Sequence, residues 1–359
     1  MNSFKVALSF LVFYSFYQMA FANFETKNKG KIVKSIGVIG EGAWGTAIAS
    51  LLAENGYQVH LWCYDKVVAQ GINQEHKNSH YMPDFVLSPR IIAYTDLKDV
   101  MFNEWIFIST PIKFFRDIVT QCKPYYRRNQ RWVVLSKGIE NDTLMLPSQI
   151  LAHVLSSQIN VAVLGGPSFA HGVMDRCTTG VNIAASDSII AEDLALLVRN
   201  AWFRPFINDD VLGIELGGAL KNVVAILLGI STGMQNDDNT HALLFTRAWQ
   251  EMTALAEALG AKHKTLQDLA GIGDLFLTVS GHYSRNFFVG KRLGSGQKLE
   301  SVLQETGFIP EGLNTVKTVK QLIEKYQLTL PLFSTLYAVV FENFSPTQLT
   351  DVAVHAEDV

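Results

Sequence analysis

A run of glycines in the segment GEGAWG constrains this chain more than any other feature of its sequence. The segment follows residues 35–39, which alternate as a short buried strand, and leads into apolar residues at helical spacing that stop at Gly56. A second strand pattern, GYQVHLWCYD, comes next. In this setting Gly40 permits a tight turn, Gly42 lets the backbone approach a pyrophosphate, and Gly45 lets the helix pack against the strand. The sequence therefore predicts a dinucleotide site at the start of the helix, with a purely structural glycine turn as the alternative.

The end of the second strand bears on the choice of dinucleotide. Asp65, twenty residues after Gly45, lies where a carboxylate can bond a ribose hydroxyl, although a solvated turn residue is the alternative. No arginine adjoins Asp65, which favours NAD over NADP, while Lys66 leaves the choice open.

Strand and helix patterns continue to alternate up to about residue 207. Strand patterns cover residues 105–110, 131–138 and 160–166, and helical patterns lie between them at 114–121 and 146–155. This alternation predicts a doubly wound parallel sheet, whose ligands gather at the carboxyl ends of the strands. Those ends carry Ser109-Thr110-Pro111, Lys137-Gly138 and Gly165-Gly166-Pro167-Ser168.

The remainder of the chain is predicted to be helical. LGIELGGALKNVVAILLGIS and NTHALLFTRAWQEMTALAEALG are long helix patterns, the second stopped by Gly260. The fold class is therefore α/β, an N-terminal Rossmann-type doubly wound sheet plus an all-helical C-terminal domain. We expect a leader at residues 1–30, an NAD(P)-binding domain at 31–207, a helical substrate domain at 208–345 and a solvated tail at 346–359.

Composition and the first residues limit the environment of the chain. The formal net charge of −3 provides no global basic field for nucleic acid. The three cysteines are scattered and odd in number, so we expect neither a disulfide framework nor a metal site. Residues 1–22 are apolar after Lys5 and end in Ala20-Phe21-Ala22, as in a secretory signal or an uncleaved membrane anchor. A simple extension, or a start assigned too early, is the alternative.

Lysines and carboxylates in apolar surroundings are the candidates for chemistry. Lys137 follows a predicted strand, and Lys221 is embedded in the apolar pattern GGALKNVVAILLG. Because burial disfavours an ammonium and lowers its pKa, Lys221 is a candidate acid–base group, with a snorkelling surface lysine as the alternative. Asp274 lies in LAGIGDLFLT and Glu311 in IPEGLNT, and helix capping is the alternative for both.

A second basic group is predicted at a helix start. HYSRNFFVGKRLG places Ser284, Arg285 and Asn286 in a row where a helix begins. An arginine with neutral donors at a helix start suits a phosphate, whereas a surface charge is the alternative for Arg285 alone.

Ordered motifs connect these residues to a known family. GEGAWGTA, SKGIE, GPSFA, GGALKNV, NTHALLFTR, AGIGDL and SRNFFVG, followed by PEGLNT, span about residues 34–340. On these motifs the sequence resembles the bacterial-type NAD(P)-dependent glycerol-3-phosphate dehydrogenases. The resemblance implies interconversion of sn-glycerol 3-phosphate and dihydroxyacetone phosphate with NAD or NADP, in the cytoplasm, supplying glycerol 3-phosphate for phospholipid synthesis.

The resemblance also implies residue roles. Lys221 takes the role of general acid/base, without a metal. The implied cofactor contacts are Gly40, Gly42, Ala43, Trp44, Gly45, Tyr64, Asp65, Lys137, Ala170, Arg285, Ile309 and Glu311. The implied substrate contacts are Lys137, Gly166, Ser168, Lys221, Asp274, Ser284, Arg285 and Asn286.

Several positions depart from the family pattern and keep alternatives open. His171-Gly172 replaces a charged pair after GPSFA, Asp238 and His241 replace an expected glycine and arginine, and Tyr64 stands where an arginine is common. These departures bear on cofactor preference and catalytic efficiency. A related two-domain dehydrogenase of another hydroxy substrate and an exported non-catalytic relative are the rival functions. The apolar second domain is compatible with a homodimer.

Overall fold

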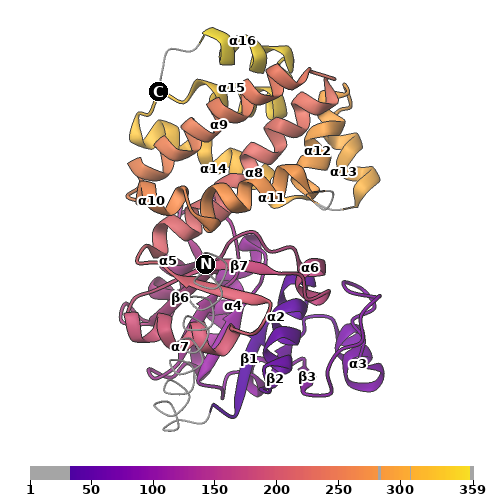
Figure 1. Cartoon of the computed structure of the whole chain (residues 1–359), viewed down its shortest axis with the longest axis vertical. Helices are drawn as coiled ribbons and strands as arrows, with labels where there is room; N and C mark the ends of the chain where they lie inside the picture. Colours follow the sequence, from indigo (N-terminus) through magenta and orange to yellow (C-terminus); the bar gives the residue numbers. More distant parts are fainter. Residues whose placement is uncertain (1–32, 282–283, 308, 356–359) are drawn as a thin grey trace, which may run out of the picture. The chain divides into compact units, whose positions relative to one another are not determined.

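An eight-stranded sheet forms the first part of the protein. The computed structural model describes residues 33–281, 284–307 and 309–355, and the expected leader lies outside them. The strands follow the spatial order β3-β2-β1-β4-β5-β6-β7-β8. They are β1 Ser35–Ile39, β2 Gln58–Trp62, β3 Ile91–Tyr94, β4 Trp105–Ile108, β5 Arg131–Val134, β6 Asn160–Gly165, β7 Thr179–Ala185 and β8 Phe203–Ile207. The chain thus crosses from β1 to β2 and β3 on one side and continues from β4 on the other, which is the doubly wound arrangement expected (Figure 1).

The sheet is parallel except at one pair of strands. β6 and β7 are antiparallel, with Leu164 opposite Ile183, whereas β7 and β8 are again parallel. The expected doubly wound parallel sheet is confirmed as a predominantly parallel one. The sequence patterns did not predict the antiparallel pair, which arises because β7 returns directly after one short helix and not through a full crossover. β3, β7 and β8 are also strands that the sequence patterns did not single out.

Helices pair in two groups beside the sheet. α2 packs against α7, and α4 packs against α5. The glycine turn leads into α2, and α4 and α5 correspond to the helices expected at 114–121 and 146–155. The helices and 3-10 turns of this part are α2 Ala43–Glu54, α3 Lys66–Glu75, η1 Leu97–Asp99, α4 Ile112–Cys122, η2 Lys123–Tyr125, α5 Pro147–Val154, α6 Ala170–Met174 and α7 Ser188–Val198.

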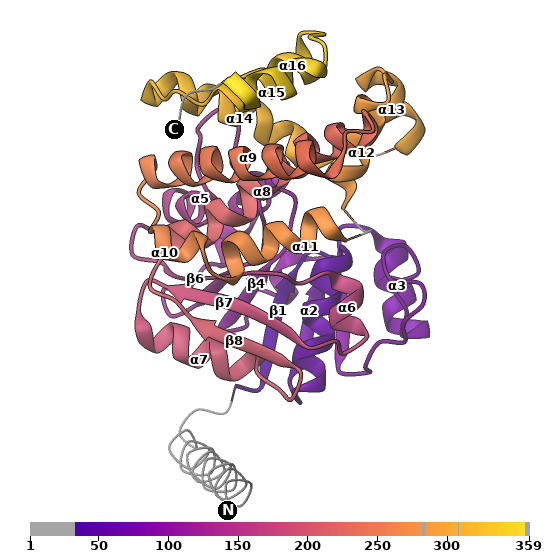
Figure 2. The same ribbon diagram turned by 45° about the horizontal axis from the view of Figure 1, so that its top comes forward.

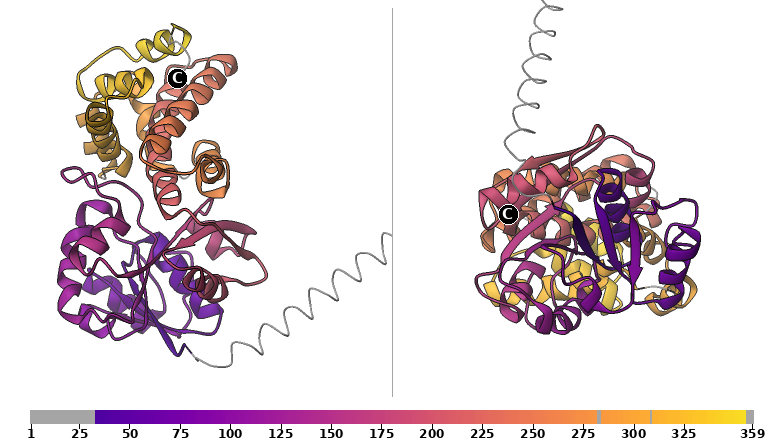
Figure 3. Two further views of the ribbon diagram at one scale, coloured as in Figure 1. Left: turned by 90° about the vertical axis from the view of Figure 1, so that its left-hand side faces the viewer. Right: turned by 90° about the horizontal axis from the view of Figure 1, so that it is seen from below.

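From Val211 onward the described chain is helical (Figures 1 and 3). Its elements are α8 Val211–Gly233, α9 Asp238–Ala258, α10 His263–Leu266, the π-helical turn η3 Leu269–Gly273, α11 Asp274–Ser280, α12 Arg285–Gly294, α13 Leu299–Thr306, α14 Glu311–Tyr326, α15 Pro331–Phe341 and α16 Thr347–His355. α8 is the central element, because α9, α11, α12 and α14 all pack against it. Strands give way to helices between Ile207 and Val211, but the described residues from Ser35 onward pack as one compact unit. The division into two domains at 207/208 therefore stays a prediction.

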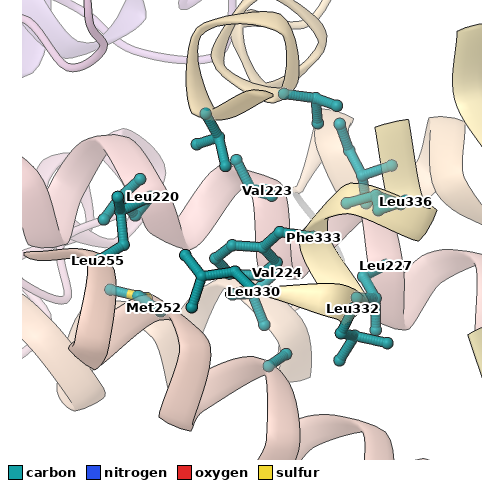
Figure 4. Packing of buried hydrophobic residues seen from close by; sticks show 14 of the residues in the cluster. Leu220, Val223, Val224, Leu227, Met252, Leu255, Leu330, Leu332, Phe333 and Leu336 are labelled. Atoms are coloured by element: carbon teal, nitrogen blue, oxygen red, sulfur yellow. The ribbon is translucent and has the colours of Figure 1, made fainter. Parts of the chain in front are cut away.

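The apolar core of the helical part surrounds α8. Leu220, Val224 and Leu227 of α8 are fully buried and lie among Met252 and Phe333 in Figure 4. α8 is long and apolar enough to cross a membrane by length and composition, but 89% of its most apolar window is buried inside the protein. Because its neighbours cover it, its composition is that of a core helix.

The predicted solvated tail at 346–359 is wrong over its described part. Residues 347–355 form α16, which packs against α9 and α15. Leu349 and Ala353, four residues apart, are each only 1% exposed and belong to the helical core. Leu349 and Ala353 form an apolar stripe on one face of α16. Two apolar residues in so short and polar a segment do not produce a clear helical pattern in the sequence.

Two buried glutamates bind the starts of helices. Glu215 of α8 accepts hydrogen bonds from the backbone and hydroxyl of Ser148 in the first turn of α5. Glu251 of α9 accepts from the backbone N–H groups of Leu332 and Phe333, at 2.7 and 2.8 Å, at the start of α15. Both satisfy N–H groups that a helix start leaves without partners, and burial raises the pKa of each glutamate to about 7.

Candidate functional site

The turn between β1 and α2 requires glycine at two of its three positions. Gly40 has φ +113°, and a Cβ there would lie 2.5 Å from the carbonyl oxygen of Ser109, at the end of β4. A Cβ on Gly45 would lie 1.9 Å from the carbonyl oxygen of Gly40, so the helix approaches the turn too closely for any side chain. Gly42, the N-cap of α2, would meet nothing within 4 Å. The space beside Gly42, at the start of α2, is therefore open.

The residues around this space fit a dinucleotide. The indole Nε1 of Trp44 and the hydroxyl of Thr110 are buried, and no hydrogen-bond partner lies within reach among the described residues. Buried polar atoms normally have partners, so these two atoms are suited to a ligand that arrives beside Gly42. Ala43 and Trp44 form the first turn of α2, where backbone N–H groups and the helix dipole favour a phosphate.

Asp65 and Tyr64, at the end of β2, occupy different surroundings. Asp65 is the N-cap of α3, and its Oδ1 accepts the N–H of Val67 at 2.7 Å. The capping role does not compete with ribose binding, because a carboxylate has a second oxygen. Tyr64 is 83% exposed. Its predicted cofactor contact stays a prediction.

Two lysines converge on one carboxylate. Lys137 follows β5, and its Nζ lies 2.6 Å from Oδ2 of Asp274. Lys221 of α8 lies 2.5 Å from Oδ1 of the same residue and donates to the hydroxyl of Thr278 at 2.8 Å. Lys137 comes from the loop after β5, Lys221 from α8 and Asp274 from α11, which lies beside α8 in Figure 2. We call Lys137, Lys221, Asp274 and Thr278 the lysine network.

Lys221 is buried and not a snorkelling surface residue. Only 6% of it is exposed, and burial lowers its pKa below the ordinary lysine value. Asp274 opposes this shift, whereas the like charge of Lys137 adds to it. Asp274 is 1% exposed and does not cap its helix through its side chain, since its two oxygens bind the two ammonium groups.

Glu311 belongs to the electrostatic surroundings of this network. Burial raises its pKa to about 7, while Lys137, the N–H of Ile112 at the start of α4, Lys221 and Arg285 act in the opposite direction. Glu311 is the first residue of α14 and is half-buried. A second carboxylate therefore lies in the field of the lysine network, and its bond to Ile112 joins the start of α14 to the start of α4.

The Ser284–Asn286 segment opens α12 as expected. Ser284 is the N-cap, and its hydroxyl accepts the N–H of Phe287 at 3.2 Å. The side-chain oxygen of Asn286 accepts the N–H of Gly312 at 2.9 Å, beside Glu311. A Cβ on Gly312 would lie 2.9 Å from the backbone oxygen of Asn222 on α8, so glycine permits the close approach of α14 to α8.

The remaining predicted contacts lie on loops. Gly166 has φ +142°, and its carbonyl accepts the hydroxyl of Ser168 at 3.0 Å in the loop between β6 and α6. Ala170 is the first residue of α6. Ile309 is 64% exposed. No contact in the structure assigns these residues to a ligand, and their roles stay predictions.

Two of the residues that depart from the family pattern, His171 and His241, have local packing partners. His241 of α9 lies 3.3 Å from the hydroxyl of Ser231 on α8, and Asp238 is in the first turn of α9. The ring of His171 packs edge-on against Phe85. His171 and His241 therefore take part in contacts outside the lysine network.

Three residues of the site were missed by sequence reasoning. Thr278 lies four residues after Asp274, and this helical spacing could have placed both on one face. Glu41 stands inside the glycine motif and is 7% exposed. Asn78 is fully buried and donates to the carbonyl of Glu41 at 2.8 Å. No sequence pattern predicts that Asn78, on a loop, reaches back to the turn.

Sequence models of known families match both parts of the chain. The model for the N-terminus of NAD-dependent glycerol-3-phosphate dehydrogenase matches residues 35–191, and the model for its C-terminus matches residues 210–351. The chain belongs to this family. A curated glycerol-3-phosphate dehydrogenase [NAD(P)+] from Syntrophotalea carbinolica is 38% identical over 315 residues, which are 87% of this chain and 95% of the relative. Another, from Lysinibacillus sphaericus, is 38% identical over 89% of this chain and 95% of its own length.

Solved structures of the family share the fold. The crystal structure of glycerol-3-phosphate dehydrogenase from Coxiella burnetii has a TM-score of 0.85 and 33% identity, and covers 90% of this chain and 99% of its own. The glycerol-3-phosphate dehydrogenase of Saccharomyces cerevisiae, at 27% identity, has a TM-score of 0.79 with the same coverage of each chain. The arrangement of a Rossmann-type sheet followed by helices is therefore that of the glycerol-3-phosphate dehydrogenase family.

Proposed function

We propose that this protein interconverts sn-glycerol 3-phosphate and dihydroxyacetone phosphate with NAD or NADP, and that it supplies glycerol 3-phosphate for phospholipid synthesis. The observation that carries the proposal is the lysine network, in which Lys221 and Lys137 bind one buried carboxylate. A structural ion pair needs one lysine, whereas an acid–base site next to a developing oxyanion has use for two. The family membership and the open space beside Gly42 agree with it.

Lys221 is proposed as the general acid in the reducing direction. NAD(P)H, when bound, supplies the hydride for the carbonyl carbon. Two N–H donors of Lys221 are engaged by Asp274 and Thr278, and the ammonium has one more for a substrate oxygen. That proton passes to the oxygen as the alcohol forms, and in the oxidising direction the neutral amine takes it from the hydroxyl.

Asp274 and Lys137 are proposed to tune this transfer. Asp274 fixes the position of Lys221 and favours its charged form, while Lys137 disfavours it. The opposing effects leave an amine that can both give and take a proton near neutral pH, as an acid–base group requires. Lys137 also supplies positive charge where the substrate oxygen becomes negative.

The predicted substrate and cofactor contacts fit a small phosphate ester. Ser284, Arg285 and Asn286 are proposed to bind the phosphate at the start of α12, with Gly166 and Ser168 on the opposite loop. Trp44, Ala43, Ala170, Ile309, Glu311 and the glycine turn are proposed to hold the cofactor, with Asp65 on its ribose. Binding energy from the distant phosphate then positions the reacting carbon.

A substrate panel tests the proposal. The full-length protein is assayed for oxidation of NADH and NADPH with dihydroxyacetone phosphate, with acetoacetyl thioesters and 2-keto acids as alternatives. We expect turnover with dihydroxyacetone phosphate only. No turnover with any substrate would favour the non-catalytic alternative, and turnover with another compound would reassign the substrate.

Location and assembly complete the proposal. We propose that the protein acts in the cytoplasm, where its cofactor is available, and as a homodimer. N-terminal sequencing of the native protein tests the first statement, since removal of residues 1–22 would indicate export. Light scattering tests the second.

A further inference from the structure

A buried carboxylate lies inside the glycine turn, where the pattern requires only small residues. Glu41, between Gly40 and Gly42, is 7% exposed. Its Oε1 accepts the backbone N–H of Asp65 at 3.2 Å. The side chain is therefore directed away from the turn toward the carboxyl end of β2, where Asp65 begins α3.

The backbone that carries Glu41 is held in place by two further side chains. Its carbonyl oxygen accepts the hydroxyl of Thr46 at 2.9 Å and the side-chain amide of Asn78 at 2.8 Å. The amide of Asn78 also lies 2.8 Å from the Thr46 hydroxyl. These buried bonds hold the backbone from which the Glu41 side chain leaves the turn.

The field at the end of β2 is negative. Glu41 and Asp65 both add to the effect of burial in raising the pKa of Cys63 and of Tyr81. Within the described part of the chain, neither carboxylate has a lysine, arginine or histidine nitrogen within 4 Å. Arg285 of α12 opposes the effect of the two carboxylates on Tyr81, and the exposed Lys66 directly follows Asp65 in the chain.

We propose that the buried Glu41 is a further specificity residue, which reinforces the preference for NAD over NADP expected from the ribose contact of Asp65. The inference rests on the proposed cofactor site and adds the specificity of that site. A 2′-phosphate would bring up to two negative charges to the end of β2, next to two carboxylates, one of them buried where repulsion is weakly screened. The 2′-hydroxyl of NAD instead donates a hydrogen bond to a carboxylate. Glu41 acts as a specificity residue through charge, and Asp65 through charge and direct contact.

Equilibrium binding tests the inference without requiring turnover. The dissociation constants of NADH and NADPH for the full-length protein are measured by calorimetry at low salt and at 0.5 M NaCl. We expect NADH to bind at least about tenfold more tightly at low salt, and the ratio to shrink at high salt because charge repulsion is screened. Equal affinities, or tighter binding of NADPH, would overturn the inference.

Two isosteric variants locate the effect. Glu41→Gln keeps an acceptor for the Asp65 N–H, and Asp65→Asn keeps an acceptor for the Val67 N–H. Each is expected to reduce the NADH/NADPH affinity ratio severalfold, and the double variant to abolish it, chiefly through tighter NADPH binding. An unchanged ratio of NADH to NADPH affinity in the folded double variant would contradict the inference. A loss of the preference for NADH in Lys66→Ala alone would contradict it as well.

Matched controls separate local from general charge effects. Asp187→Asn changes the N-cap of α7. Asp187 accepts the N–H of Ile189 at 2.8 Å, as Asp65 accepts the N–H of Val67 at the start of α3. Glu54→Gln removes a charge from the other end of α2. Both are expected to leave the ratio unchanged. If Glu41→Gln does not fold, the NADH/NADPH affinity ratio of the wild-type protein and its dependence on salt still test the inference. Preference for NADH without turnover of dihydroxyacetone phosphate would refute the proposed reaction and leave this inference standing.

Discussion

The two ends of the proposed site are built in different ways. At the glycine turn the backbone makes the site, and the positions that require glycine lie within six residues of one another. At the lysine network side chains make the site, and Lys137 and Asp274, whose atoms lie 2.6 Å apart, are 137 positions apart in the chain. Sequence alone can therefore describe the first end, whereas the second exists only once α8 and α11 have packed together. The difference teaches that cofactor binding and proton transfer can be altered separately.

The largest expected effect is at the lysine network. Replacing Lys221 with alanine removes the proposed acid, so kcat for dihydroxyacetone phosphate should fall about 1000-fold, within the usual contribution of acid–base catalysis. The affinity for NADH should change less than about threefold, because the turn is unaffected. Steady-state kinetics and calorimetry measure the two quantities. Lys264→Ala, at an exposed lysine of α10, is the control, and comparable turnover in both variants would refute the assignment.

Asp274→Asn should reduce kcat about 100-fold and also destabilise the protein. It leaves Lys137 and Lys221 without their shared counter-charge in a buried position, which typically costs about 3 kcal/mol of unfolding free energy. Denaturant unfolding measures the loss. Asp193→Asn breaks an ion pair with Arg131 at the surface and should cost less than about 1 kcal/mol. Equal losses in the two variants would mean that the network is no more than a surface ion pair.

Two glycine substitutions should separate folding from cofactor binding at the other end. Gly45→Ala places a Cβ 1.9 Å from a carbonyl oxygen and should destabilise the fold by about 2 kcal/mol. Gly42→Ala meets nothing within 4 Å, so it should fold normally and bind NADH about tenfold more weakly, which is about 1.4 kcal/mol. Thermal unfolding and calorimetry distinguish them. Normal NADH affinity in Gly42→Ala would show that the cofactor does not approach this residue.

The smallest expected effect concerns one hydroxyl. Thr278→Val removes an acceptor of the Lys221 ammonium and should lower kcat severalfold without changing NADH affinity. Thr253→Val is a matched control, because its hydroxyl is buried without a hydrogen-bond partner among the described residues. The control should have full activity. Kinetics in which both variants are equally active would remove Thr278 from the network.

Much of the fold could be predicted because its signals are local. The glycine spacing, the alternation of strands with helices and the long apolar pattern of α8 each depend on neighbouring residues. The direction of β7 depends on the path of the chain around α6, and the burial of α16 depends on α9 and α15, so neither has a local signal. At the site, Lys221 could be singled out as a charge in an apolar helix. Asn78 could not, since a loop must first fold back onto the turn before its amide reaches Glu41.

The pH dependence of kcat in both directions tests the central claim most directly. In reduction Lys221 must be protonated, so kcat should fall as pH rises through its pKa. In oxidation Lys221 must be neutral, so kcat should rise through the same pKa. Because burial and Lys137 lower that pKa, both transitions should lie below the ordinary lysine value of about 10.4, and Asp274→Asn should move them lower still. Profiles that run parallel in the two directions, or that Asp274→Asn leaves unmoved, would contradict proton transfer by Lys221.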